Sequence, residues 1–100
     1  MSPEFMAGVA LTLSEWMEKI GQIKEAMVYL RKVEDIYNYT YGAMDRRSAK
    51  VKRSIALLLL KLSDYEKALE VLREVEEVEK TIFGEDSLQI AKTLKVIGTI

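Results

Sequence analysis

The sequence repeats itself at a spacing of 42 residues, and this period limits the folds that the chain can adopt. When the chain is shifted by 42 positions, 12 of the 58 overlapping pairs are identical, whereas composition alone predicts about four. The identical pairs include Ala26/Ala68, Leu30/Leu72, Val33/Val75, Gly42/Gly84 and Lys50/Lys92. A period of this length is typical of solenoids, in which each unit packs against its neighbours.

Each unit is predicted to form two helices, because apolar residues recur at three- and four-residue steps. In the second unit this stripe comprises Tyr65, Ala68, Leu69, Leu72, Val75, Val78 and Ile82. The intervening glutamates, which are predicted to face solvent, are Glu66, Glu70, Glu74 and Glu77. We predict helices near residues 7–20, 23–41, 47–62, 65–82 and 88–100. Residues 63–66 have the pattern of a capping box, and Gly42 and Gly84 predict helix ends. A similar box at residues 12–15 would let the first helix begin later.

The predicted fold class is all-α, an α-solenoid of antiparallel helix pairs with about two and a half repeats. Repeat 1 spans residues 6–45, repeat 2 spans 46–86, and 87–100 form the first helix of a third repeat. Because that helix has no partner in the chain, we expect the chain to be a piece of a longer array. Residues 1–5 are set aside, because Ser2-Pro3-Glu4-Phe5 is typical of a cloning-vector remnant.

The residue types present exclude several kinds of chemistry. Cysteine and histidine are absent, which excludes a thiol nucleophile, an imidazole base, a disulfide and the usual zinc sites. The carboxylates, such as Glu74, Glu76, Glu77 and Glu79, lie on predicted solvent faces, so we predict no enzymatic activity, no cofactor and no metal site. The net charge of −1 and the short apolar run 55–60 do not indicate binding to nucleic acid or a membrane. The lack of cysteine fits an intracellular, cytoplasmic location.

The order of small, aromatic and large residues resembles the tetratricopeptide repeat family. The pattern runs over Leu13, Ser14, Met17, Ile23, Ala26, Leu30 and Val33, and again over Ile55, Ala56, Leu59, Tyr65, Ala68, Leu72 and Val75. The long period and the segment 83–94 are similar to the variety found in kinesin light chains and nephrocystin-like proteins. Ser87-Leu88 stands where that variety has His-Pro, and the linker 42–45 is degenerate. The resemblance covers residues 7–100 and implies a scaffold that binds other proteins.

In this family the first helix of each pair lines a concave groove, and the resemblance carries this role over by position. The implied groove positions are Leu11, Glu15, Glu18, Lys50, Arg53, Leu57, Leu60, Lys61, Lys92, Lys95 and Thr99. Of these we predict Lys50, Arg53, Lys92 and Lys95 to bind a partner through charge, and Leu57 and Leu60 through apolar contact. Four cations favour a protein partner with an acidic peptide segment. The alternative interpretation is a solvated charged face above ordinary core leucines.

One specific partner can be tested against the residues. Chaperone-binding members of the family hold a C-terminal carboxylate with a set of Lys, Asn and Arg side chains. The corresponding positions here are Leu11, Glu15, Ser54, Lys92 and Val96. Lys92 alone has the required type, and a bidentate grip on a carboxylate needs several converging donors. Binding of a chaperone tail is therefore not expected.

Self-association is the alternative function. The unpaired third-repeat helix is predicted to expose Ile90, Leu94 and Ile97, so that chains could form a homo-oligomer edge to edge or by exchanging helices.

The remaining aromatic and basic residues are assigned mainly to packing and solvent. Trp16 aligns with Leu58 and is predicted to lie in the core. Tyr37, Tyr39 and Tyr41 are predicted to pack against the following helix pair, with a recognition patch as the alternative. The basic run 46–53 has no interleaved aromatic residue, so nucleic-acid contact is not expected.

Overall fold

The computed structural model describes residues 2–84 and 88–100, which form helices joined by short turns. The helices are α1 (Pro3–Lys19), α2 (Ile23–Tyr41), α3 (Arg46–Lys61), α4 (Tyr65–Phe83) and α5 (Leu88–Gly98). No strand occurs in these two ranges, and the predicted all-α class is confirmed. No helix there has both the length and the apolar character needed to cross a membrane. The expected boundary between repeats 2 and 3, with the linker Glu85-Asp86-Ser87, lies outside the described residues.

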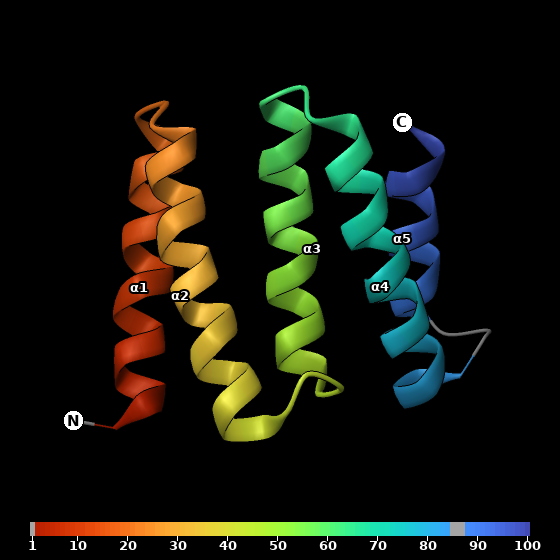
Figure 1. The fold of residues 1–100 in the computed structure, drawn as a ribbon, viewed down its shortest axis with the longest axis horizontal. Coiled ribbons are helices and arrows are strands. Elements are labelled where there is room, and N and C mark those ends of the chain that lie inside the picture. Colours follow the sequence, from red (N-terminus) through yellow and green to blue (C-terminus); the bar gives the residue numbers. More distant parts are fainter. Residues whose placement is uncertain (1, 85–87) are drawn as a thin grey trace.

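Consecutive helices pack against one another along the chain, as expected for a solenoid. Helix α1 packs on α2, α2 on α3, α3 on α4 and α4 on α5, with α1 and α5 lying behind α2 and α4 in Figure 1. We call α1, α3 and α5 the first helices and α2 and α4 the second helices. Each first helix reverses direction into its second helix through a tight turn, so the pairs α1/α2 and α3/α4 are antiparallel hairpins.

The core confirms the repeat, because equivalent positions are buried alike. Ala26 on α2 and Ala68 on α4 are both fully buried, and so are Val33 and Val75. Alanine at these positions lets the two helices of a hairpin approach closely, and the larger apolar side chains fill the remaining space. The predicted stripe on α4 is wrong at its two ends, where Tyr65 and Ile82 are exposed.

The helix ends follow local capping chemistry, with two corrections to the sequence-based boundaries. Gly42 and Gly84 end α2 and α4 with φ of 94° and 87°, a backbone conformation that favours glycine. Helix α4 is capped by Asp64, whose carboxylate accepts from the Lys67 amide at 3.4 Å, and not by Ser63. Helix α1 begins at Pro3 instead of near residue 7, because Ser2 caps it and proline fits its first turn.

Trp16 lies at the surface, so its assignment to the core is wrong. Its side chain is 67% exposed, whereas the repeat-equivalent Leu58 on α3 is buried. The difference arises because α2 packs against α3, whereas among the described residues no second helix packs on the corresponding side of α1. The repeat predicts which face of a helix is apolar, but burial also requires a neighbour to cover it.

Two of the three clustered tyrosines pack as predicted, and Tyr39 does not. The rings of Tyr37 and Tyr41 lie 5.7 Å apart, and the Arg47 guanidinium of α3 lies 4.0 Å from the centre of the Tyr41 ring. Tyr39 is almost fully exposed. The end of α2 is therefore joined to the start of α3 by stacking on Tyr41.

Tyr41 also donates a hydrogen bond of 2.6 Å to Glu4, and this bond raises the pKa of Tyr41 above its ordinary value of 10.0. Because the folded state favours the neutral phenol, this contribution to stability is present below the ordinary pKa and is lost as the pH rises through the raised one. Replacing Glu4 with Gln should move the NMR titration of the Tyr41 ring to lower pH. Glu15→Gln is the control, and an unchanged midpoint in Glu4→Gln would contradict the assignment.

Candidate functional site

A hollow between α1 and α3 contains Leu57, the exposed leucine of the predicted groove. Its volume is about 210 Å³, and its lining consists of Leu11, Ser14, Glu15, Glu18, Leu30, Ser54, Leu57 and Leu58. Leu57 is 43% exposed within it. Lys61 of α3 bonds to Glu18 of α1 at 2.6 Å, so the two first helices are also joined by an ion pair. Leu57 therefore lies where an apolar side chain of a partner can be received, beside acidic groups.

A second hollow, of about 300 Å³, lies where α3 meets α4 and the start of α5. It is lined by Arg46, Arg47, Ala49, Lys50, Arg53, Glu79, Phe83 and Gln89. Arg47 is already engaged, because it stacks on Tyr41 and pairs with Asp45 at 3.6 Å. Lys50 is exposed and has no ion pair among the described residues. This hollow supplies the basic end of the surface formed by the first helices.

Arg53 does not act as a free cation of this surface, because it joins three helices. Its guanidinium lies 3.3 Å from the Glu79 carboxylate of α4 and 3.3 Å from the Thr93 hydroxyl of α5. It also reaches the Gln89 carbonyl oxygen at 3.5 Å. The Thr93 hydroxyl donates to the other carboxylate oxygen of Glu79. We call Arg53, Glu79 and Thr93 the interhelical cluster. Their contacts join α3, α4 and α5.

Burial explains why the interhelical cluster is structural. Glu79 is only 3% exposed, Thr93 is fully buried, and the Arg53 side chain is 17% exposed. A carboxylate at this depth requires a cation and hydrogen-bond donors. Sequence reasoning grouped Glu79 with the solvated carboxylates of α4, and that interpretation is wrong. The signal was present, because positions 68, 72, 75 and 79 continue one buried stripe in steps of four, three and four.

The structure separates the six predicted binding residues into two groups. Lys50, Lys92, Lys95 and Leu57 are exposed and available to a partner. Arg53 belongs to the interhelical cluster, and Leu60 is half-buried against the main hydrophobic core. The position of Leu60 in the repeat predicts a groove residue, but in the structure its side chain packs against the core beside Leu59. The available set is thus three lysines and one leucine.

The predicted exposed edge of α5 is also only partly correct. Leu94 is exposed, but Ile90 is 2% exposed, because α5 packs on α4. Ile97 is half-buried.

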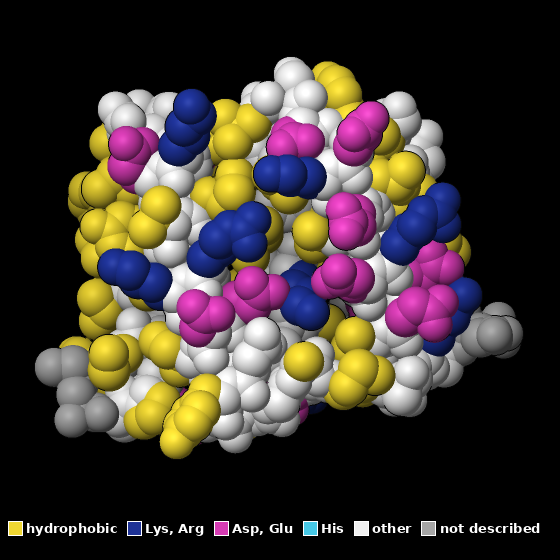
Figure 2. All heavy atoms as spheres, viewed as in Figure 1, with side chains coloured by type: hydrophobic (Ala, Val, Ile, Leu, Met, Phe, Trp, Pro, Cys, Tyr) yellow, Lys and Arg dark blue, Asp and Glu magenta, His cyan; other side chains and the backbone are white. Residues whose placement is uncertain are grey.

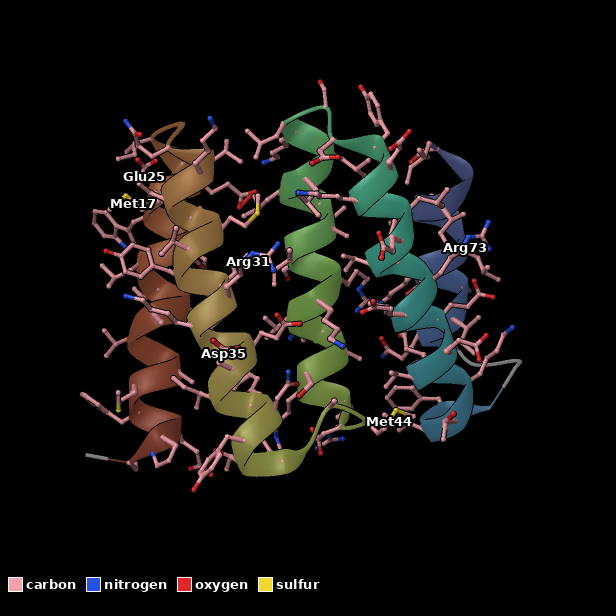
Figure 3. All side chains as sticks on the ribbon, viewed as in Figure 1. Met17, Glu25, Arg31, Asp35, Met44 and Arg73 are labelled. Carbon is pink, nitrogen blue, oxygen red and sulfur yellow. The ribbon has the colours of Figure 1, made fainter. Side chains whose placement is uncertain are left out.

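The face formed by the second helices has mixed charge and offers no comparable stripe. Figure 2 shows Lys and Arg interspersed with Asp and Glu over α2, α3 and α4. Figure 3 shows Arg31 extending from α2 toward α3, where it lines a hollow of about 260 Å³ together with Lys24, Lys67 and Asp64. Interspersed charges of both signs cancel at a distance. This face therefore serves as a reference surface for the binding experiment below.

Comparison with known proteins identifies the fold. A scan of protein families and a search of curated proteins each give no match. Among solved structures, the chain is similar to BtubC (BKLC) from P. vanneervenii, with a TM-score of 0.86 at 19% sequence identity. The match covers 99% of this chain and 39% of BtubC, so the chain spans less than half the length of that protein. The similarity shows a TPR-like helical repeat fold, as the resemblance to the tetratricopeptide repeat family implies.

Proposed function

We propose that the chain is a protein-interaction scaffold whose first helices capture a partner segment with acidic residues. One observation carries this proposal: Lys50 on α3 and Lys92 on α5 are exposed at repeat-equivalent positions, and Leu57, about two helical turns from Lys50 on α3, is exposed as well. Cations repeated along neighbouring units suit an extended acidic chain, and an exposed leucine suits one apolar anchor. A helical repeat fold is in general a scaffold for protein interaction.

The groove in this proposal differs from the sequence-based set, because Arg53 and Leu60 are left out. Arg53 is satisfied by Glu79 and Thr93, so a partner carboxylate would have to compete with a buried ion pair. Lys95, the repeat equivalent of Arg53, is exposed and is kept. The proposed binding residues are Lys50, Lys92, Lys95 and Leu57.

Binding of a fluorescent peptide that alternates Asp or Glu with leucine tests the proposal. Changing Lys50, Lys92 and Lys95 together to Glu should weaken binding about tenfold or more, because attraction becomes repulsion. Raising the salt concentration should weaken wild-type binding as well, since exposed charges are screened. Fluorescence anisotropy measures both effects.

The control changes three exposed cations on the second helices, Lys24, Lys67 and Arg73, to Glu. This variant has the same net charge as the groove variant, so a loss of binding confined to the groove variant supports the proposed surface. Equal losses in the two variants would instead show general electrostatic attraction. Unchanged binding in the groove variant, or no binding by the wild type, would reject the proposal.

A further inference from the structure

Helix α1 has an apolar stripe on the side opposite to its packed face. The packed face consists of Ala7, Ala10 and Ser14, which are buried. The opposite stripe, which we call the α1 stripe, comprises Phe5, Val9, Leu13, Trp16 and the C-cap residue Ile20, at steps of four, four, three and four residues. These side chains are 37–67% exposed, and Figure 2 shows hydrophobic side chains along the edge that α1 forms. A helix that is apolar on two opposite sides is typical of one that is covered on both.

The repeat indicates that a helix is the structural element that packs against a face like the α1 stripe. Val9, Leu13 and Trp16 are equivalent by the 42-residue shift to Val51, Ile55 and Leu58 of α3. All three residues of α3 are buried, because α2 packs against α3. The α1 stripe is therefore the same helix-receiving face, and no helix among the described residues covers it. The second helices of another copy are already packed against α3 and α5, so they are not free to fill it.

Together with the neighbouring exposed Thr12, the positions of the α1 stripe are symmetric about the point between Thr12 and Leu13. Reversing the direction of the helix exchanges Phe5 with Ile20, Val9 with Trp16, and Thr12 with Leu13. We propose that two copies of this chain form a two-fold homodimer in which their α1 helices pack antiparallel through the α1 stripe. Because a two-fold interface uses the same patch on both chains, it requires this self-complementary order.

The surface shape of α1 also fits the antiparallel pairing about the point between Thr12 and Leu13. A hollow of about 440 Å³ is lined by Phe5, Gly8, Val9, Thr12 and Leu13 on one half of the stripe, and Trp16 stands on the other half. In the antiparallel register the Trp16 ring of each chain lies opposite Val9 of its partner and enters this hollow. Gly8 leaves the space open, since a Cβ built on it meets no atom within 4 Å. The two tryptophans thus become central anchors, a role that suits this side chain.

The size and charge of the surface are adequate for a dimer. The exposed parts of the five stripe side chains amount to roughly 500 Å² per chain, so full coverage would bury about 1,000 Å² in all, the lower limit for a specific interface. The stripe contains no charged residue, so closure leaves no ion of the stripe unpaired. Antiparallel helices also align their dipoles favourably. The central residues Val9, Thr12, Leu13 and Trp16 all lie outside residues 1–5.

Sedimentation and fluorescence of the full chain test the dimer together. We expect a reversible species with twice the 11.4 kDa chain mass. Because Trp16 is the one tryptophan in the sequence, its emission should shift to shorter wavelength as the concentration rises and the ring is buried. Trp16→Ala should raise the dimer dissociation constant by roughly thirtyfold or more.

Gly8→Leu provides a second variant that keeps the fold. Leucine is a better helix former than glycine, yet it fills the hollow, so this variant should stay helical and lose the dimer. Leu94→Ala on α5 is the control and should dimerise like the wild type. A chain that stays monomeric at all concentrations, or a dimer lost only in Leu94→Ala, would overturn the proposal.

Single cysteines test the register, because the chain has no cysteine of its own. Thr12→Cys places two thiols next to the two-fold axis, so mild oxidation should link the dimer covalently. Tyr65→Cys is exposed and lies on α4, which packs on α3 and α5, so it should stay unlinked. Equal cross-linking of both variants, or growth into larger oligomers, would contradict a closed two-fold pair.

Discussion

Replacing Arg53 with alanine is expected to lower the free energy of unfolding by about 3–5 kcal/mol, because it leaves a buried carboxylate without its cation. Glu79 is almost fully buried, and Arg53 provides its ion pair at 3.3 Å. Thr93 donates a hydrogen bond to the same carboxylate, but a hydroxyl does not neutralise the charge. Urea denaturation followed by circular dichroism measures the loss.

Two further variants separate the effect of burial from the effect of charge alone. Lys95→Ala removes the repeat-equivalent cation at an exposed position, and it should change stability by at most about 0.5 kcal/mol. Replacing Arg53 and Glu79 together with Leu and Met removes both charges, so most of the loss should be recovered. If Arg53→Ala lowers the free energy of unfolding no more than Lys95→Ala does, then Glu79 does not depend on Arg53, and the interhelical cluster is not structural.

The interhelical cluster also determines which variants can report on binding. A reversal of Arg53 would place a second carboxylate beside Glu79 and separate α3 from α4 and α5. A loss of partner binding in such a variant would then reflect unfolding. The exposed lysines Lys50, Lys92 and Lys95 avoid this difficulty, because each can be reversed without removing a described ion pair.

Most of the fold could be predicted from the sequence, because helices and repeats are encoded locally. The positions of Gly42 and Gly84 fix the ends of α2 and α4, and the buried pair Ala26 and Ala68 fixes the close approach within each hairpin. These features depend on backbone conformation and on side-chain size at regular spacing. Neither requires knowledge of distant contacts.

The proposed binding surface was less predictable, because exposure depends on neighbouring helices. Position alone made Arg53 equivalent to Lys95, yet Arg53 faces Glu79 and Thr93 while Lys95 faces solvent. Trp16 and Leu58 are equivalent as well, and only Leu58 is covered. A 42-residue shift relates equivalent sequence positions, but it does not predict whether a neighbouring helix packs on each of them.

Ile55→Ala should lower the free energy of unfolding by about 2–5 kcal/mol, because it opens a cavity where α2 packs on α3. Ile55 is 2% exposed and belongs to the main core cluster, together with Leu30 and Val33 of α2. Thermal and urea unfolding at low protein concentration, where any dimer is dissociated, measure this loss. Since the cluster joins repeat 1 to repeat 2, the whole chain should unfold in one less stable transition.

The matched control is Leu13→Ala, which truncates the repeat-equivalent side chain on α1. Leu13 is 37% exposed because no second helix packs on it, so its truncation should cost only about 1 kcal/mol. The difference between the two variants measures what a covering helix contributes at one position of the repeat. Equal losses of unfolding free energy in the two variants would mean that packing of α2 on α3 contributes little to stability. The solenoid packing would then not be the source of stability. A larger loss in Leu13→Ala that appears only at high protein concentration would instead report the proposed α1 pairing, since only that pairing covers Leu13.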